Sequence, residues 1–78
     1  MSKTKIDLIK CFQTIFPSIP VDEITRISTS SFPEWDSVAN IQLTCIIEEI
    51  FEIELDDEIL ESLTSFTQIL RYLENKNG

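Results

Sequence analysis

The chain has 78 residues, of which 42% are hydrophobic, and it carries a formal net charge of −8. A chain of this length forms one small domain, and an acidic surface repels nucleic acid and anionic membranes but attracts basic proteins. Histidine is absent, cysteine occurs twice and glycine once. This composition excludes nucleophiles activated by histidine, phosphate-binding glycine loops and a structural zinc site, so we expect neither an autonomous enzyme nor a metal centre.

The two cysteines, Cys11 and Cys45, lie in largely apolar sequence of helical pattern. Two lone cysteines in a chain without a signal peptide are more often reduced than disulfide-bonded. The start of the chain lacks the apolar core of a signal peptide, and no segment approaches the ~18 apolar residues of a transmembrane helix. We therefore expect a soluble, cytoplasmic monomer without a membrane partner.

Residues 3–16 are predicted to form the first helix, because apolar residues recur along one helical stripe with two more beside it. Pro17 ends this helix, since proline lacks the backbone N–H and clashes with the preceding turn. The residues of the stripe are Ile6, Ile9, Phe12 and Phe16, and those beside it are Leu8 and Ile15.

Residues 17–36 are predicted to form a connection that is long compared with the about 4–6 residues of most loops. Loops of such length tend to be functional or to contain a short element. Residues 21–27 are compatible with one helical turn. The residues of this connection that we expect to face inward are Ile24, Ile27, Phe32 and Trp35.

Residues 36–51 are the most informative stretch, because their apolar residues recur at i, i+3, i+4, i+7 and i+8 and define one buried face of a second long helix. Asp36 and Ser37 stand at its start, and side-chain oxygens of both residue types accept the free N–H groups of a first turn. We therefore expect the serine hydroxyl at a loop–helix boundary, with Trp35 two residues away. The predicted buried face consists of Leu43, Ile46, Ile47, Ile50 and Phe51.

Three apolar residues, Val38, Ile41 and Cys45, lie on the opposite side of this helix and are called the outer strip below. Acidic residues border the strip, chiefly Glu48 and Glu49. A solvent-facing helix surface is normally polar, so an apolar strip with an acidic rim favours a contact surface for another protein. The alternative is that scattered exposed apolar residues are common and without function.

Residues 52–58 alternate apolar and acidic side chains, but they are too few for a strand and have no partner strand, so we expect an extended connection. Asp56 or Asp57 is predicted to cap a short helix, and Thr64 or Ser65 is predicted to cap a last long one. The residues of these two helices that we expect to face inward are Ile59, Leu60, Leu63, Phe66, Ile69, Leu70 and Leu73.

These segments predict an all-α fold, a small antiparallel bundle of three main helices and one short helix. Residues 75–78 are expected to fray. We expect residues 1–78 to form a single domain, in which the long loop at residues 17–36 leads to the helix start at residues 36–37.

The chain resembles the acyl carrier proteins from its first predicted helix to its last. The most specific part of the resemblance begins at the second long helix. In that family an Asp-Ser-Leu motif opens the second helix. A Glu-Glu pair, a phenylalanine and an Ile-x-Ile/Leu segment follow it before an acidic turn. The matching residues here are Asp36-Ser37-Val38, Ile41, Leu43, Ile47-Glu48-Glu49, Phe51, Ile53-Glu54-Leu55 and Asp57-Glu58.

The resemblance implies that Ser37, next to Asp36, carries a 4′-phosphopantetheine arm, which a phosphopantetheinyl transferase attaches from coenzyme A. The thiol of the arm holds an acyl group as a thioester, so that residues 1–78 would be a carrier domain. The expected partners are this transferase and acyl-loading and acyl-transferring enzymes. We expect their basic docking patches to meet the outer strip and its rim of Glu48 and Glu49.

Four positions near this serine distinguish the chain within the family pattern. Val38 stands in place of the usual leucine, and Ala39 and Gln42 stand where the family often has acidic residues. Trp35 directly before the motif looks more like stand-alone carriers of specialised pathways. Such pathways would be polyketide-like, fatty-acyl or surface-polysaccharide modification.

Two other interpretations stay open. An aminoacyl or peptidyl carrier, such as a D-alanyl carrier, would use the same serine for a different cargo. A small helical adaptor would bind a partner through the outer strip and carry no cofactor, and its Ser37 would be a helix cap only. A covalently modified Ser37 would separate both carriers from the adaptor.

Overall fold

Five helices make up the regular structure of residues 3–77, the part of the chain that this computed structural model describes. They are α1 (Lys3–Ile15), α2 (Val21–Ile24), α3 (Ser37–Phe51), α4 (Asp57–Ser62) and α5 (Phe66–Asn77). The predicted all-α class is confirmed, and these residues contain no strand. There are two short helices where the predicted bundle had one. The additional one is α2, where the amides of Glu23 and Ile24 both donate to the Pro20 carbonyl.

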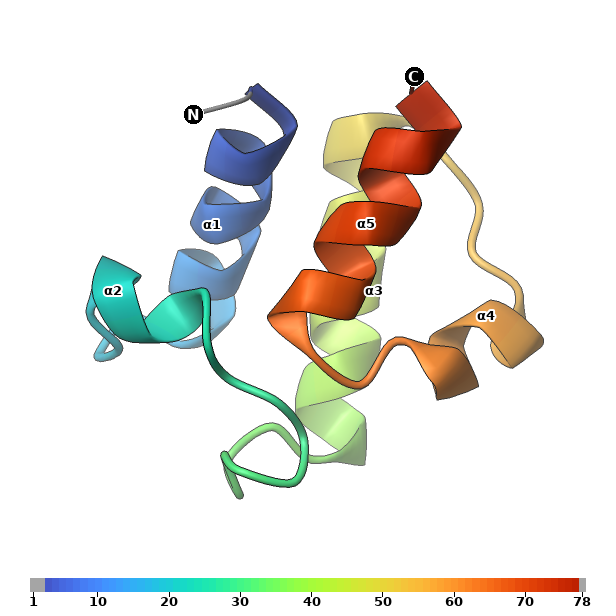
Figure 1. Ribbon diagram of the computed structural model, residues 1–78. Helices are drawn as coiled ribbons and strands as arrows, with labels where there is room; N and C mark the ends of the chain where they lie inside the picture. Colours follow the sequence, from blue (N-terminus) through green and yellow to red (C-terminus); the bar gives the residue numbers. More distant parts are fainter. Residues whose placement is uncertain (1–2, 78) are drawn as a thin grey trace.

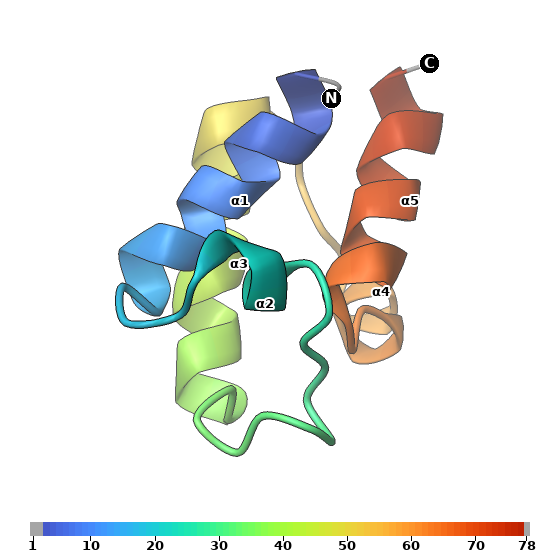
Figure 2. The ribbon, with the colours of Figure 1, turned by 60° about the vertical axis from the view of Figure 1, so that its left-hand side comes forward.

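Helix α1 packs against α2, α3 and α5 and therefore joins most of the fold (Figure 1). It runs opposite to α3 and α5, which share one direction. The chain passes from the end of α3 back along the bundle, so that α4 lies at the end where α5 begins (Figure 2). Among the helices of residues 3–77, none is long and apolar enough to cross a membrane.

The core forms around the middle of α1, where Leu8, Cys11 and Phe12 are fully buried. The ring of Phe12 makes edge-on contacts with Trp35 and Phe66, at centroid distances of 5.3 and 5.2 Å. These contacts join α1 to the segment before α3 and to the first residue of α5. Trp35 therefore pins the long loop to the helices, as its position in the sequence predicts.

The rest of the long loop is anchored in a similar way. Ile24 and Ile27 are buried as predicted, and Phe32 makes an edge-on contact with Phe16 at 5.1 Å. Several residues of the predicted buried faces are only partly buried at the edge of the core: Ile15, Phe32, Ile46, Phe51, Ile59, Leu60 and Leu70.

Two residues predicted to be buried are exposed instead: Ile6, at 40%, and Ile50, at 48%. Ile6 lies near the start of α1 and Ile50 near the end of α3, and these two ends lie at the same end of the bundle (Figure 1). Periodicity assigns a residue to a helix face but does not say how far along the helix its packing partners extend. Thr44 is buried instead, and its hydroxyl donates to the Asn40 carbonyl at 2.7 Å.

The start of α5 has a side-chain cap and the start of α4 has none. Ser65 Oγ accepts from the Gln68 amide at 3.2 Å, and Gln68 Oε1 accepts from the Thr64 amide at 2.9 Å. This arrangement is close to a capping box. Asp56 occupies the N-cap position of α4, but its side chain makes no capping hydrogen bond. Residues 75–77, expected to fray, belong to α5, whereas Gly78 lies outside the described residues.

Candidate functional site

Ser37 is the first residue of α3, and its side chain is exposed. Asp36 occupies the N-cap position, and its Oδ1 accepts a hydrogen bond from the Ala39 amide at 2.9 Å. The sequence predicted either Asp36 or Ser37 as the cap of this helix, and in the structure the cap is Asp36. The Ser37 hydroxyl is therefore not committed to holding the helix start.

The start of α3 carries a partial positive charge. The Asp36 carboxylate takes the Ala39 amide and the Asp36 carbonyl takes the Asn40 amide. The amides of Ser37 and Val38 have no acceptor among the residues described. Free amides at a helix N-terminus, together with the helix dipole, favour a negatively charged group beside Ser37.

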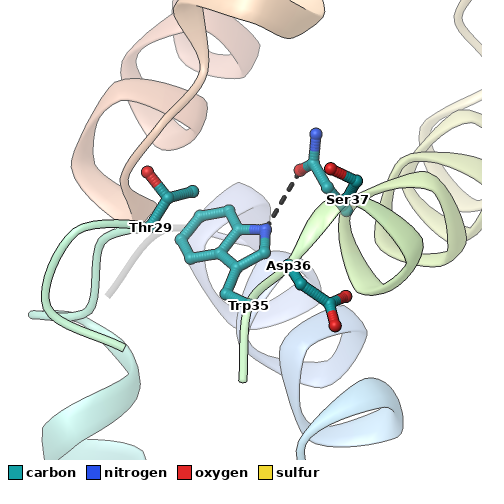
Figure 3. Close-up of a pocket in the computed structure, with 5 residues that line it drawn as sticks. Thr29, Trp35, Asp36 and Ser37 are labelled. Carbon is teal, nitrogen blue, oxygen red and sulfur yellow. Dashed lines mark hydrogen bonds between the residues drawn. The ribbon is translucent and has the colours of Figure 1, made fainter. Parts of the chain in front are cut away.

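A hollow of about 300 Å³ opens beside Ser37 (Figure 3). Its wall combines three segments: the loop after α2, the residues just before α3, and the first turn of α3. The residues that line it are Thr29, Trp35, Asp36, Ser37 and Asn40.

Trp35 forms a fixed wall of this hollow. Its side chain is only 3% exposed and its ring lies against Phe12. The indole Nε1 donates a hydrogen bond to Asn40 Oδ1 at 3.0 Å (Figure 3). The same interaction therefore orients the Asn40 amide, which follows Ser37 by three residues on the helix.

Thr29 is held in place by backbone pairing with the segment between α4 and α5. Its amide donates to the Thr64 carbonyl at 2.8 Å, and the Phe66 amide donates to the Ile27 carbonyl at 3.2 Å. These bonds flank an antiparallel bridge between Ser28 and Ser65. The Thr29 wall of the hollow is thus tied to the junction of α4 and α5.

The outer strip is exposed, as predicted. Val38 is 65% and Ile41 63% exposed, and Cys45 is also exposed. Val38 directly follows Ser37, so an enzyme that reaches the Ser37 hydroxyl also approaches the start of this strip.

The two acids of the predicted rim differ in structure. Glu49 is exposed. Glu48 is half-buried, and its Oε2 accepts a hydrogen bond from the Leu55 amide at 2.9 Å. Glu48 therefore stabilises the connection between α3 and α4, and Glu49 is the rim acid that is free to face a partner.

Both cysteines are free thiols. Burial, followed by the nearby charge of Asp7, raises the pKa of the Cys11 thiol to about 11, although a backbone hydrogen bond acts in the opposite direction. Cys11 lies in the core and does not line the hollow, and a buried neutral thiol is a poor nucleophile. Cys11 is therefore a packing residue.

Two lining residues, Thr29 and Asn40, were not among the residues that the sequence singled out. The spacing of Asn40 from Ser37 places both on one side of a helix, so this signal was present. Thr29 gave no such signal, because its position depends on the pairing of Ser28 with Ser65.

Within residues 3–77, no three acidic or cysteine side chains come together as a metal-binding group. No protein-family model matches the chain. No solved structure is significantly similar to it.

Proposed function

We propose that this chain is a cytoplasmic acyl carrier protein that holds acyl groups as thioesters on a 4′-phosphopantetheine arm attached to Ser37. The observation that carries the proposal is the exposed Ser37 hydroxyl at the first position of α3, where Asp36 supplies the cap instead. The Asp36-Ser37-Val38 motif and its spacing to Glu48-Glu49 give independent support from the sequence.

The proposed modification joins Ser37 Oγ to the phosphorus of the arm. A phosphodiester bond forms at Oγ, the pyrophosphate bond of coenzyme A breaks, and the nucleotide leaves with the electron pair of that bond. The hydroxyl proton passes to a base of the transferase. The positive start of α3, with the free amides of Ser37 and Val38, favours the resulting negative charge.

The arm supplies the thiol chemistry when it is bound, and the protein supplies the surface that partner enzymes recognise. The transferase and the acyl-loading enzymes would bind that surface at the outer strip, because Val38 directly follows Ser37. A net charge of −8 favours partners with basic docking patches. Trp35 before the motif supports a specialised pathway, such as polyketide-like, fatty-acyl or surface-polysaccharide modification.

The proposal is tested by intact-mass measurement of the full chain. The chain is incubated with coenzyme A and a broad-specificity phosphopantetheinyl transferase. We expect a mass gain of one phosphopantetheinyl group, no gain for Ser37→Ala and a normal gain for the control Ser62→Ala, which removes another exposed serine. An unchanged mass, or modification that persists in Ser37→Ala, would contradict the assignment.

The same experiment separates one of two alternatives from the acyl carrier, and the other differs only at the loading step. An aminoacyl or peptidyl carrier, such as a D-alanyl carrier, would gain the same arm at Ser37 and then differ in the cargo that its loading enzyme attaches. A helical adaptor is favoured by the exposure of Val38 and Ile41. It would gain no mass, and its partner would bind the unmodified chain.

A further inference from the structure

We propose that the hollow lined by Thr29, Trp35, Asp36, Ser37 and Asn40 holds the segment of the arm nearest to Ser37. This inference rests on the proposed function. The segment beyond the phosphate carries a carbon with two methyl groups, a hydroxyl and an amide, and the hollow offers a matching surface for each kind of group.

The size of the hollow and the attachment point select this occupant. Its volume of about 300 Å³ lies at the lower end of the ~300–1,000 Å³ of small-molecule sites. The hollow is therefore large enough for part of the arm. Ser37 itself lines the hollow, so a group attached there is present at the high effective concentration of a short tether, on the order of millimolar.

The polar groups of the wall have defined roles. An indole N–H only donates, so the Asn40 atom that Trp35 contacts is the carbonyl Oδ1. The Asn40 Nδ2 therefore remains a donor, suited to a hydroxyl or carbonyl oxygen of the arm. The Thr29 hydroxyl both donates and accepts, and it is suited to the amide of the arm. Trp35 is 3% exposed, and the small part of its side chain that lines the hollow is an apolar surface suited to the two methyl groups.

The hollow is also largely formed in advance. The hydrogen bond of Thr29 to Thr64 fixes one wall, and the contacts of Trp35 with Asn40 and Phe12 fix another. A site whose walls are already ordered loses little conformational entropy when it is filled. Even weak contacts are then enough to bias the position of a tethered arm.

Nuclear magnetic resonance of the apo and modified chains tests this inference, with mass measurement to confirm the modification. Trp35 is the only tryptophan, so its indole N–H resonance is unique. We expect nuclear Overhauser contacts from the methyl groups of the arm to the Trp35 ring. We also expect the indole N–H and the Asn40 side-chain amide to shift on modification.

Two valine variants test the polar contact. Thr29→Val removes the hydroxyl but keeps the backbone bond to Thr64, and it is expected to reduce the contacts between the arm and Trp35. Thr67→Val makes the same change at an exposed position of α5 and should leave them as in the natural chain. Circular dichroism of both variants verifies the fold.

The outcomes separate this inference from the proposed function. A modified chain whose arm shows no contacts with Trp35, or whose contacts are unchanged in Thr29→Val, overturns the assignment of the hollow and leaves the carrier function intact. A chain that gains no mass overturns the carrier function, and the assignment of the hollow falls with it.

Discussion

The Glu48 carboxylate accepts a hydrogen bond from the Leu55 amide at 2.9 Å, across the end of α3. Leu55 is buried in the connection to α4, so this bond holds the chain where it turns back along the bundle. Adjacent acids in the sequence therefore have different roles, since Glu48 is a structural residue and Glu49 a surface charge.

We predict that Glu48→Ala lowers the free energy of unfolding by about 1–2 kcal/mol, because it removes a hydrogen bond to a charged acceptor. Glu48→Gln keeps an oxygen that can accept from Leu55 and should restore part of the loss. Glu49→Ala should change the stability by less than about 0.5 kcal/mol, as expected of an exposed position. Urea titrations of the three variants measure these differences, and equal losses for the two alanine variants would contradict a structural role of Glu48.

A second prediction concerns Glu52, which follows α3 in the left-handed conformation, with φ 54° and ψ 48°. This conformation is unfavourable for a residue with a Cβ, and a negative charge at a helix C-terminus opposes the dipole. We expect Glu52→Gly to raise the free energy of unfolding by about 0.5–1 kcal/mol. Glu54→Gly, at a position without positive φ, should lower it. Thermal and urea unfolding would contradict this reasoning if both variants changed stability in the same direction.

The sequence predicted the long helices and most of the core, because helical periodicity is a strong signal over ten or more residues. The errors have a common physical origin. Ile6 and Ile50 continue their apolar stripes to one end of the bundle, where both are exposed. Thr44 is buried because its hydroxyl bonds to the carbonyl one turn earlier. The apolar pattern of a single helix predicts neither the exposure of Ile6 and Ile50 nor the burial of Thr44. Both depend on the neighbouring helices and on side-chain conformation.

The candidate site was predictable only in part. Asp36 and Ser37 can be recognised from their residue types and from the helix that follows them. The hollow beside them cannot be recognised from the sequence, because Thr29 reaches it through backbone pairing with Thr64, thirty-five positions later in the chain. A local sequence pattern contains no information about such a distant contact.

A third prediction separates the roles of Asp36 and Ser37. Asp36→Ala removes the side-chain acceptor of the Ala39 amide and should lower the free energy of unfolding by about 1 kcal/mol. Ser37→Ala should change it by less than about 0.5 kcal/mol, because the hydroxyl does not cap α3. Chemical denaturation of both variants gives the comparison. A larger loss in Ser37→Ala than in Asp36→Ala would return the capping role to the serine.

The fourth prediction follows from the Cys11 thiol, whose pKa burial raises to about 11 from 9.0. Well below pH 9 the thiol is protonated in both the folded and the unfolded chain, so its full contribution to stability is present. As the pH rises from 9 toward 11, the unfolded chain loses this proton first, and stability falls by at most ~1.4 kcal/mol per pH unit.

Unfolding measurements on variants isolate this effect from other groups that titrate at high pH. Cys11→Ala should be less stable at neutral pH, since it leaves a small cavity, but its stability should fall less steeply above pH 9. Cys45→Ala, which changes the exposed thiol, should keep the slope of the natural chain. Identical slopes in all three proteins would show that Cys11 does not titrate in this way.

The last prediction concerns the outer strip as the docking surface for the phosphopantetheinyl transferase. Val38→Asp should slow arm attachment by about tenfold or more at every salt concentration, because it places a charge at the apolar centre of the contact. Glu49→Lys should slow attachment roughly threefold to tenfold at low salt and less at high salt, because rim charges mainly set the rate of association. Single-turnover attachment followed by intact mass measures both.

Two controls make these rates interpretable. Glu48→Lys is unsuitable as a pure charge variant, because it also removes the bond to Leu55, and Glu49 is therefore the rim position to change. Ile47→Asp buries an unpaired charge in the core and should unfold the domain, which circular dichroism detects as a loss of helix. Val38→Asp and Glu49→Lys should instead keep the helical spectrum, because both positions are exposed. If these two folded variants accept the arm at the natural rate across all salt concentrations, the transferase docks on another face.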